Sequence, residues 1–247
     1  AFSVRLVDCV GYMVDSAVGQ FEDLSPRMVM TPWFDHEIPM TEAAEIGTRK
    51  VITDHATVGI VVTTDGTITD IPREDYREAE ERVIRELQDI GKPFVVLVNS
   101  AQPEDPRAAA AAAEIQTRYG VTCRCVNCLT LTEEDIGDIL RDLLYQFPLR
   151  ELDVFLPEWV DALPGEHPIR SGLYQEIGEA ASQLTRICAL PPCLTALSQG
   201  ENIESAAAST IDLGSGVAQV EIRLPRRLFF ETLSQRSGLQ VTDDGDP

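Results

Sequence analysis

Two uninterrupted apolar runs constrain the fold more than any other feature of this sequence. They are residues 57–63 (TVGIVVT) and 93–98 (PFVVLV), and an amphipathic stretch at 73–90 separates them. A strand that is apolar at nearly every position is buried on both faces, and two parallel strands need a long crossover, usually a helix. The pattern therefore predicts a parallel sheet with helices on both faces.

The same alternation of strand and helix extends over the first 150 residues. Further strands are predicted at 2–7 and 121–126, and further helices at 40–54, 104–119 and 133–147. Gly91 should end the helix at 73–90. Thr132 with Asp135 should cap the start of the helix at 133–147. The buried stripe of the helix at 73–90 is predicted to be Tyr76, Ala79, Val83, Ile84, Leu87 and Ile90, with Glu78–Arg82 and Glu81–Arg85 pairs outside.

The pattern changes after Pro148, which places a domain boundary near Arg150. We expect an α/β domain over 1–150 and a small α+β domain over 151–247. The second domain should contain a helix at 169–184, a Pro-Cys loop at 191–193 and a short helix at 226–235. A hairpin is predicted from strands at 210–213 and 217–224, which a Gly-Ser-Gly turn joins.

Composition narrows the classes of partner. The 247 residues carry a formal net charge of −21. Such a surface repels phosphate backbones and anionic headgroups, so we expect no nucleic-acid partner. No apolar run approaches the ~18 residues of a spanning helix and no signal peptide opens the sequence, which favours an intracellular protein. Because Ala1 stands inside a predicted strand, we expect a preceding segment.

The six cysteines do not predict a metal centre. Cys123, Cys125 and Cys128 lie close together in the sequence. However, the strand pattern at 121–126 places Cys123 and Cys125 on one face of a strand, whereas structural zinc sites use knuckles on tight turns. We therefore interpret these thiols as part of the strand's packing surface, and a disulfide framework is equally disfavoured in so large and apolar a chain.

The first candidate site residues are Asp8 and Gly11. An apolar strand that ends in Asp, with Gly three residues later, is the DxxG arrangement of P-loop nucleotide hydrolases. There the Asp holds Mg²⁺, usually through water, and the Gly backbone N–H reaches the γ-phosphate. We assign Asp8 as metal ligand and catalytic residue and Gly11 as catalytic residue, although Asp-x-x-Gly is also an ordinary turn.

A second candidate group follows the run at 93–98. Asn99 and Ser100 stand where GTPases carry Asn-Lys-x-Asp, the motif that reads the base, and we assign both to nucleotide binding. Gln102 replaces the final Asp. A neutral amide cannot supply the two-oxygen acceptor that guanine requires, so guanine specificity should be lost.

Long strings of this sequence resemble the stage IV sporulation protein A family. They are VRLVDCVGYMVD, PRMVMTPWFDHEIPMTEAAEIGTRKVITDHATVGIVVTTDGT, YREAEERVIRELQDIGKPFVVLVNS and LPEWVDAL. The resemblance implies a GTPase-derived fold, a partial P-loop NTPase sheet with flanking helices, that uses ATP and Mg²⁺. It also implies that hydrolysis drives assembly into a polymer at the base of the bacterial spore coat.

The resemblance further implies partners and a location. Family members polymerise with themselves on the outer surface of the forespore, in the mother-cell cytoplasm. They are anchored there by a small amphipathic peptide and recruit other coat proteins. By position, Asp8 matches the family's magnesium-coordinating acid, Gly11 the glycine of the same motif and Asn99 the base-side residue.

This sequence also departs from the family. It has no G-x-x-x-x-G-K-[ST] loop, so we expect an internal piece of a longer protein that by itself does not bind ATP. The stretch TPWFDHEIPM, with Trp33, Phe34 and His36, is either a nucleotide-sensing or subunit-contact loop or a loop packed on its own core.

Two other functions stay open. The chain could be a structural interaction module without a nucleotide, for which the missing phosphate loop argues. It could also belong to a GTPase of translation-factor type, against which Gln102 argues.

Overall fold

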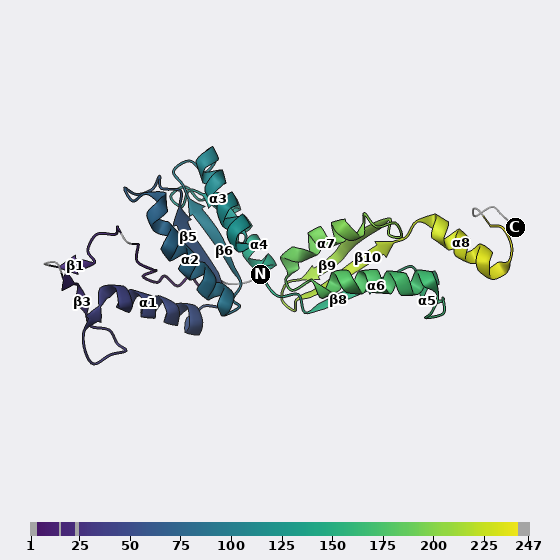
Figure 1. The fold of residues 1–247 in the computed structure, drawn as a ribbon, viewed down its shortest axis with the longest axis horizontal. Helices are drawn as coiled ribbons and strands as arrows, with labels where there is room; N and C mark the ends of the chain where they lie inside the picture. Colours follow the sequence, from purple (N-terminus) through teal and green to yellow (C-terminus); the bar gives the residue numbers. More distant parts are fainter. Residues whose placement is uncertain (1–3, 15, 23–24, 242–247) are drawn as a thin grey trace. The chain divides into compact units, whose positions relative to one another are not determined.

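The strands predicted at 57–63, 93–98 and 121–126 form one parallel sheet in the computed structural model, which describes residues 4–14, 16–22 and 25–241 (Figure 1). They are β5 (Gly59–Thr64), β6 (Phe94–Asn99) and β7 (Cys123–Val126), in the order β5-β6-β7. Both pairings are parallel, so the strands' carboxyl ends meet at one edge. The chain divides into two compact units, residues 1–144 and 145–247.

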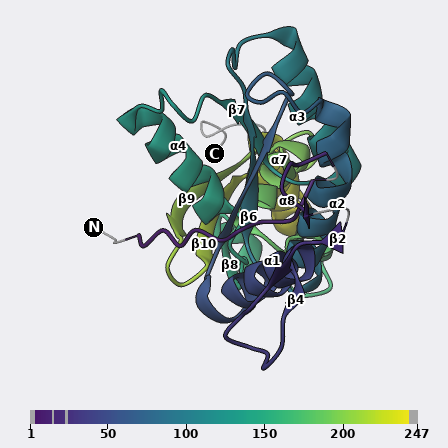
Figure 2. The same cartoon turned by 90° about the vertical axis from the view of Figure 1, so that its left-hand side faces the viewer.

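Helices cover both faces of this sheet, as the continuous apolar runs predict. α2 (Arg73–Asp89) and α3 (Pro106–Tyr119) pack on one face and α4 (Glu133–Tyr145) on the other (Figure 2). Consecutive residues of β6 alternate between the two cores: Val96 and Val98 pack with α2 and α3, and Val95 and Leu97 with α4. The predicted α/β architecture, a parallel sheet flanked by helices, is confirmed.

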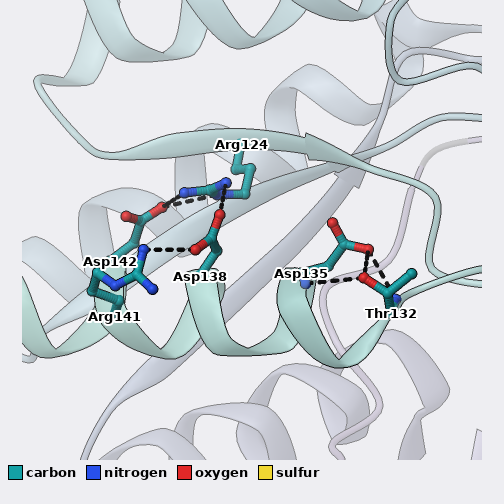
Figure 3. A network of polar contacts seen from close by, with 6 residues as sticks. All are labelled: Arg124, Thr132, Asp135, Asp138, Arg141 and Asp142. Atoms are coloured by element: carbon teal, nitrogen blue, oxygen red, sulfur yellow. Dashed lines mark hydrogen bonds and ion pairs between the residues drawn. The ribbon is translucent and has the colours of Figure 1, made fainter.

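The predicted start of α4 is confirmed as a reciprocal cap. Thr132 donates to Asp135 from its backbone nitrogen (2.8 Å) and its hydroxyl (2.7 Å), and the Asp135 nitrogen donates back to Thr132 Oγ1 (3.2 Å; Figure 3). Further along α4, Asp138 and Asp142 accept from Arg124 of β7 at 3.1 and 2.7 Å. These charge-assisted bonds fasten the helix to the edge strand of its sheet.

The buried side of α2 differs from the predicted stripe. Ile84 and Leu87 are buried, but Ile90 is 40% exposed. Glu80 is buried, because the Arg73 guanidinium binds both its carboxylate oxygens at 2.8 and 2.9 Å and neutralises its charge. A helical stripe drawn from hydrophobicity alone misses such an internally compensated pair.

The ion pairs on the outer side of α2 are confirmed in part. Arg85 binds Glu81 at 2.7 Å, as predicted from their spacing. Arg82 instead binds Glu45 at 2.7 Å, and Glu45 belongs to α1 (Met40–Lys50). Because the Glu45 carboxylate offers two oxygens to the guanidinium fork, this tertiary pair replaces the local one with Glu78.

The strand predicted at 2–7 is wrong where the structure describes it. Residues 4–10 form no strand, and residues 2–3 lie outside the described part of the chain. Val4, Leu6 and Val7 are 49%, 81% and 50% exposed. Alternation alone does not make a strand, which needs a neighbouring backbone to bond and a core against which one face is buried.

Before residue 59, the described residues form four short strands, one helix and one π-helical turn. β1 (Phe21–Glu22) pairs with β2 (Ser25–Pro26), and β3 (Met28–Val29) with β4 (Ile38–Pro39), both antiparallel. The predicted helix at 40–54 is observed as α1 followed by a π-helical turn, η1 (Val51–His55).

A second sheet organises residues 145–247. β8 (Glu151–Phe155) pairs in parallel with β10 (Val217–Arg223), which pairs antiparallel with β9 (Ser205–Asp212). The predicted hairpin is thus confirmed as β9 and β10, with a register shift at Gln219 and Val220. The position of β8 beside β10 was not predicted, because this pairing is distant in sequence.

The helices of this unit are α5 (Glu158–Asp161), α6 (Pro168–Ser182), α7 (Leu190–Leu197) and α8 (Arg226–Ser237), with a 3₁₀ turn, η2, at Ile187–Ala189. The loop predicted at 191–193 is wrong, since these residues open α7. Proline is compatible with the first helical turn, where its missing N–H has no partner to lose. No helix in the described ranges combines the length and apolarity that crossing a bilayer requires.

Candidate functional site

Polar side chains gather where β5 and β6 end. Asp65 and Thr67 follow β5, and Asn99 and Ser100 close β6. Open parallel sheets bind ligands outside the carboxyl ends of their strands. We refer to residues 99–102 as the base loop, since this is the segment for which the sequence predicts contact with a nucleotide base.

Asp65 is the acceptor that joins the two loops. Its Oδ2 accepts from Ser100 Oγ at 2.7 Å, and its Oδ1 accepts from the backbone nitrogen and hydroxyl of Thr67 at 3.0 and 2.6 Å. The Thr67 hydroxyl in turn accepts from the Ala101 nitrogen at 2.9 Å. The base loop is therefore fastened to the loop after β5 by the Asp65 carboxylate and by the Thr67 hydroxyl.

The electrostatics of Asp65 follow from these bonds. Partial burial alone would raise the pKa of this carboxyl, because it disfavours the charged form. The hydrogen bonds from Thr67 and Ser100 act in the opposite direction and outweigh it, so the pKa of Asp65 lies below its ordinary value. Asp65 is thus a carboxylate whose oxygens are occupied within the protein.

The other side of the base loop is fastened to the end of β7 and to the loop that follows it. Asn99 Oδ1 accepts from the Cys128 nitrogen at 3.0 Å, and Asn127 Nδ2 donates to the Ala101 carbonyl at 3.3 Å. The Ser100 nitrogen donates to the Val126 carbonyl at 2.9 Å. Neighbours on both sides thus hold the loop, as expected for a segment that must present groups at a fixed position.

Asn99 and Ser100 therefore lie together at the ligand-binding edge. The Ser100 side chain belongs to a fully buried residue, and its hydroxyl also accepts from the Gln102 nitrogen at 3.1 Å. A group with no exposed surface acts on a ligand only through the loop it holds. Ser100 thus holds the base loop through these bonds, and the nucleotide-binding roles of Asn99 and Ser100 stay predictions.

Asp8 and Gly11 lie elsewhere. Gly11 is held by Thr48 of α1, whose hydroxyl accepts from the Gly11 nitrogen at 2.9 Å and donates to its carbonyl at 3.2 Å. Asp8 is exposed and makes no hydrogen bond or ion pair with any residue that the structure describes. It lines a shallow pocket of about 340 Å³ beside Lys50, Asp54 and other residues at the end of α1.

This pocket lies near the amino ends of the strands. Lys92, just before β6, donates from Nζ to the carbonyls of Ile52, Thr53 and Ala56 at 2.6, 2.9 and 2.5 Å, which ties η1 to that edge. The structure therefore does not bring Asp8 to the edge where Asn99 lies. The physical reason is the strand missing at 4–7, since strand geometry is what would carry Asp8 along the sheet.

The Asp8 carboxylate is a suitable ligand for Mg²⁺, but its position in the structure does not suit a nucleotide-bound metal ion. Mg²⁺ keeps several waters and takes one or two carboxylates plus phosphate oxygens, so a single unengaged carboxylate suffices. In the described residues, no group of three or more His, Cys, Asp or Glu side chains could hold a metal ion. The assignment of Asp8 and Gly11 stays a prediction.

The aromatic stretch at 31–40 is half exposed. Trp33 and Phe34 are 43% and 36% exposed, and the Lys50 ammonium lies 5.9 Å from the Trp33 ring centroid. Phe34 contacts His36, with ring centroids 5.6 Å apart. Both interpretations of this stretch, a contact loop and a self-packed loop, are compatible with that exposure.

The thiols of the three cysteines in and after β7 are held in their protonated form by burial. Burial raises the pKa of the Cys123 thiol to about 12 and also raises that of Cys125 and Cys128. A thiol held protonated at neutral pH is a poor nucleophile.

Asp65 and Thr67 are the residues of the site that sequence reasoning did not assign. The string Thr64-Asp65-Gly66-Thr67 directly follows the apolar run at 57–63. Its signal is the Asp-Gly-Thr turn, in which an Asp side chain accepts from the backbone two residues on while Gly66 takes a φ of +89°. That signal indicates a turn, but not that its carboxylate also reaches Ser100.

Comparison with known proteins identifies the family. Residues 1–148 match the sequence model described as the ATPase domain of stage IV sporulation protein A, and residues 149–246 match the middle domain of the same protein. No solved structure matches the chain.

Individual relatives agree. The stage IV sporulation protein A of Bacillus subtilis is 41% identical over 97% of this chain and 49% of its own length, and that of Bacillus anthracis 40% over the same shares. The Clostridioides difficile protein is 37% identical over 99% of this chain and 50% of its own length. The chain thus spans about half the length of these curated relatives. It is a sporulation protein with an ATPase domain and belongs to the stage IV sporulation protein A family.

Proposed function

We propose that this chain is part of a protein that hydrolyses ATP and assembles into a polymer at the base of the bacterial spore coat. The observation that carries the proposal is the match of residues 1–148 to the family's ATPase domain. The chain's α/β fold supports it, because a parallel sheet with polar side chains at its carboxyl edge is an architecture that nucleotide hydrolases use.

The proposal gives each predicted residue a role. Asp8 orients Mg²⁺, usually through water, and Gly11 approaches the γ-phosphate through its backbone N–H. Asn99 lies on the base side, and Ser100 and Asp65 hold the loop that carries it. Phosphate charge is stabilised by the metal and by a phosphate loop that is absent from these 247 residues.

These roles require Asp8 at the carboxyl edge of the sheet. Segment 4–8 must then be paired as a strand, so that its end lies level with Thr64 and Asn99. Such a pairing has physical support, because among the described strands β5 pairs only with β6 and so has one unpaired edge. An apolar strand with one free edge is able to accept another strand.

The partners and location of the proposal come from the family. They are further copies of the same protein, a small amphipathic peptide that anchors it to a membrane, and other coat proteins. The location is the mother-cell cytoplasm at the outer surface of the forespore. The net charge of −21 supports a peptide or protein anchor over direct binding to anionic lipid.

The full-length protein that contains this chain tests the proposal. It should hydrolyse ATP in the presence of Mg²⁺, and Asp8→Ala should reduce the rate by about a hundredfold or more, because a metal-positioning carboxylate acts on the transition state. Steady-state phosphate release measures this.

Asp54→Ala is the matched control, since Asp54 is an exposed carboxylate in the same pocket to which the proposal gives no role. Its rate should equal that of the parent. Full activity in Asp8→Ala would remove Asp8 from the reaction. A parent without Mg²⁺-dependent ATP binding would favour a nucleotide-free interaction module instead.

A further inference from the structure

We propose that the side-chain amide of Gln102 contacts the adenine ring of the bound nucleotide and sets the preference for ATP. This inference rests on the proposed function, because it names the group of the same site that reads the base. Its observations are the fixed backbone at Gln102, the unengaged side chain, and the exposed leucine on the loop that is bonded to the base loop.

The backbone of Gln102 is held by buried groups. Its nitrogen donates to Ser100 Oγ at 3.1 Å, and Ser100 is fully buried and bonded to Asp65. The preceding nitrogen, that of Ala101, donates to Thr67 Oγ1 at 2.9 Å. A side chain on a backbone fixed in this way loses little further freedom when it binds a ligand.

Among the polar side chains of the base loop, those of Asn99 and Ser100 are hydrogen-bonded to other residues, whereas that of Gln102 is bonded to no described residue. Asn99 accepts from the Cys128 nitrogen, and Ser100 is bonded to Asp65. Gln102 is exposed, and its amide makes no hydrogen bond to any residue in the described ranges. Its donor and its acceptor are therefore both available to a ligand.

The loop that is bonded to the base loop carries an exposed apolar side chain. Asn127 donates to the Ala101 carbonyl at 3.3 Å and accepts from the Leu129 nitrogen at 3.0 Å, so the loop of Leu129 is joined to the base loop. Leu129 is 90% exposed. A purine has apolar faces and a polar edge, and these two joined loops carry an exposed leucine and an exposed amide.

The local charge favours the base over the phosphates. Asp65 carries its negative charge at this edge, and exposed Glu104 follows within two residues of Gln102. Both carboxylates repel a phosphate, whereas a neutral base meets no such penalty.

The chemistry of the amide matches adenine. Adenine presents an amino donor next to a ring-nitrogen acceptor, and a Gln amide binds this pair with its oxygen and its NH₂ group. A carboxylate at the same position can only accept. It would face the adenine ring nitrogen as a second acceptor, but it would satisfy two neighbouring donors on guanine.

The experiment measures Mg·ATP and Mg·GTP affinities of the full-length protein and its Gln102→Asp and Gln102→Ala variants by equilibrium titration. Gln102→Asp should weaken ATP binding by roughly tenfold or more and strengthen GTP binding by a similar factor, as expected for a bidentate base contact. Gln102→Ala should weaken ATP binding without any gain for GTP. Circular dichroism should show both variants folded, because the replaced side chain is exposed and unbonded.

The outcomes separate the two proposals. If the parent binds ATP and both variants keep its ATP affinity and its ATP-to-GTP ratio, the assignment of Gln102 is overturned while the proposed function stands. Equal weakening by Asp and Ala with no gain for GTP also overturns it, because base reading predicts opposite effects on the two nucleotides. A parent that does not bind ATP overturns both.

Discussion

The two halves of the predicted nucleotide site differ in how the protein holds them. The base loop is bonded from both sides, through Asp65 to the loop after β5 and through Asn99 to the loop after β7. Segment 8–11 is held by the side chain of Thr48 at Gly11, and its Asp8 is exposed. One half is ordered at the sheet edge, whereas the other lies away from it.

The difference teaches that a site residue is positioned by the neighbours of its strand more than by its own motif. Asn99 ends a strand that is paired on both sides, with β5 and β7, so its place follows from the sheet. Asp8 follows a segment that pairs with no described strand. Its sequence motif is at least as typical of a nucleotide hydrolase, yet the motif alone does not place it.

Asp65→Ala is expected to lower the free energy of unfolding most. The variant removes the acceptor for the buried Ser100 hydroxyl and for Thr67, and hydrogen bonds to a charged group contribute about 1.5–3 kcal/mol each. The free energy of unfolding should fall by about 2–4 kcal/mol. Urea denaturation measures this, and hydrogen exchange should quicken at Ala101 and Gln102.

Asp70→Ala is its matched control. Asp70 is an exposed carboxylate of the same loop, so its removal should change the free energy of unfolding by about 0.5 kcal/mol or less. If Asp65→Ala were as mild as this control, the base loop would not depend on the Asp65 bonds, and the contrast between the two halves would disappear.

A pH series sharpens the same point. The pKa of Asp65 is lowered in the folded chain, so its bonds stabilise the fold above the ordinary Asp pKa of about 3.9 and lose their effect as the pH falls through the lower folded value. The difference in unfolding free energy between the parent and Asp65→Asn should be constant near neutral pH and shrink below about pH 4. A difference that grows on acidification would contradict the assignment.

Thr48→Val is expected to lower the free energy of unfolding less than Asp65→Ala does. Thr48 is 2% exposed, and valine keeps its shape while removing both bonds to Gly11. The loss in unfolding free energy should be about 1 kcal/mol. Exchange of the Gly11 amide hydrogen should quicken, while that of Ala101 should stay unchanged. Slow exchange at Gly11 in the variant would mean that other contacts hold this half of the site.

Several features of the fold follow from local sequence alone. Continuous apolar runs with an amphipathic stretch between them predicted β5, α2 and β6, because burial on both faces leaves no room for polar alternation. The cap of Thr132 with Asp135 and the hairpin of β9 and β10 were also predicted from local sequence, because each depends on residues a few positions apart.

Other features depend on partners distant in sequence. Glu80 is buried because Arg73 reaches it, and β8 joins its sheet because β10 is adjacent in space. The segment at 4–7 has the alternation of a strand without a paired neighbour. No local pattern reports which distant group completes a charge pair or a ladder.

By itself, the sequence determined that the chain is an α/β sporulation-family protein in which Asn99 ends a central strand. Only the tertiary structure decided that Asp65 bonds Ser100, that Gln102 is left with an unengaged amide, and that Asp8 lies beside α1 and η1. The physical reason is the separation of the partners along the sequence. Hydrophobic periodicity and turn formation depend on neighbouring residues, whereas the hydrogen bond between Asp65 and Ser100 joins loops whose residues are 35 positions apart.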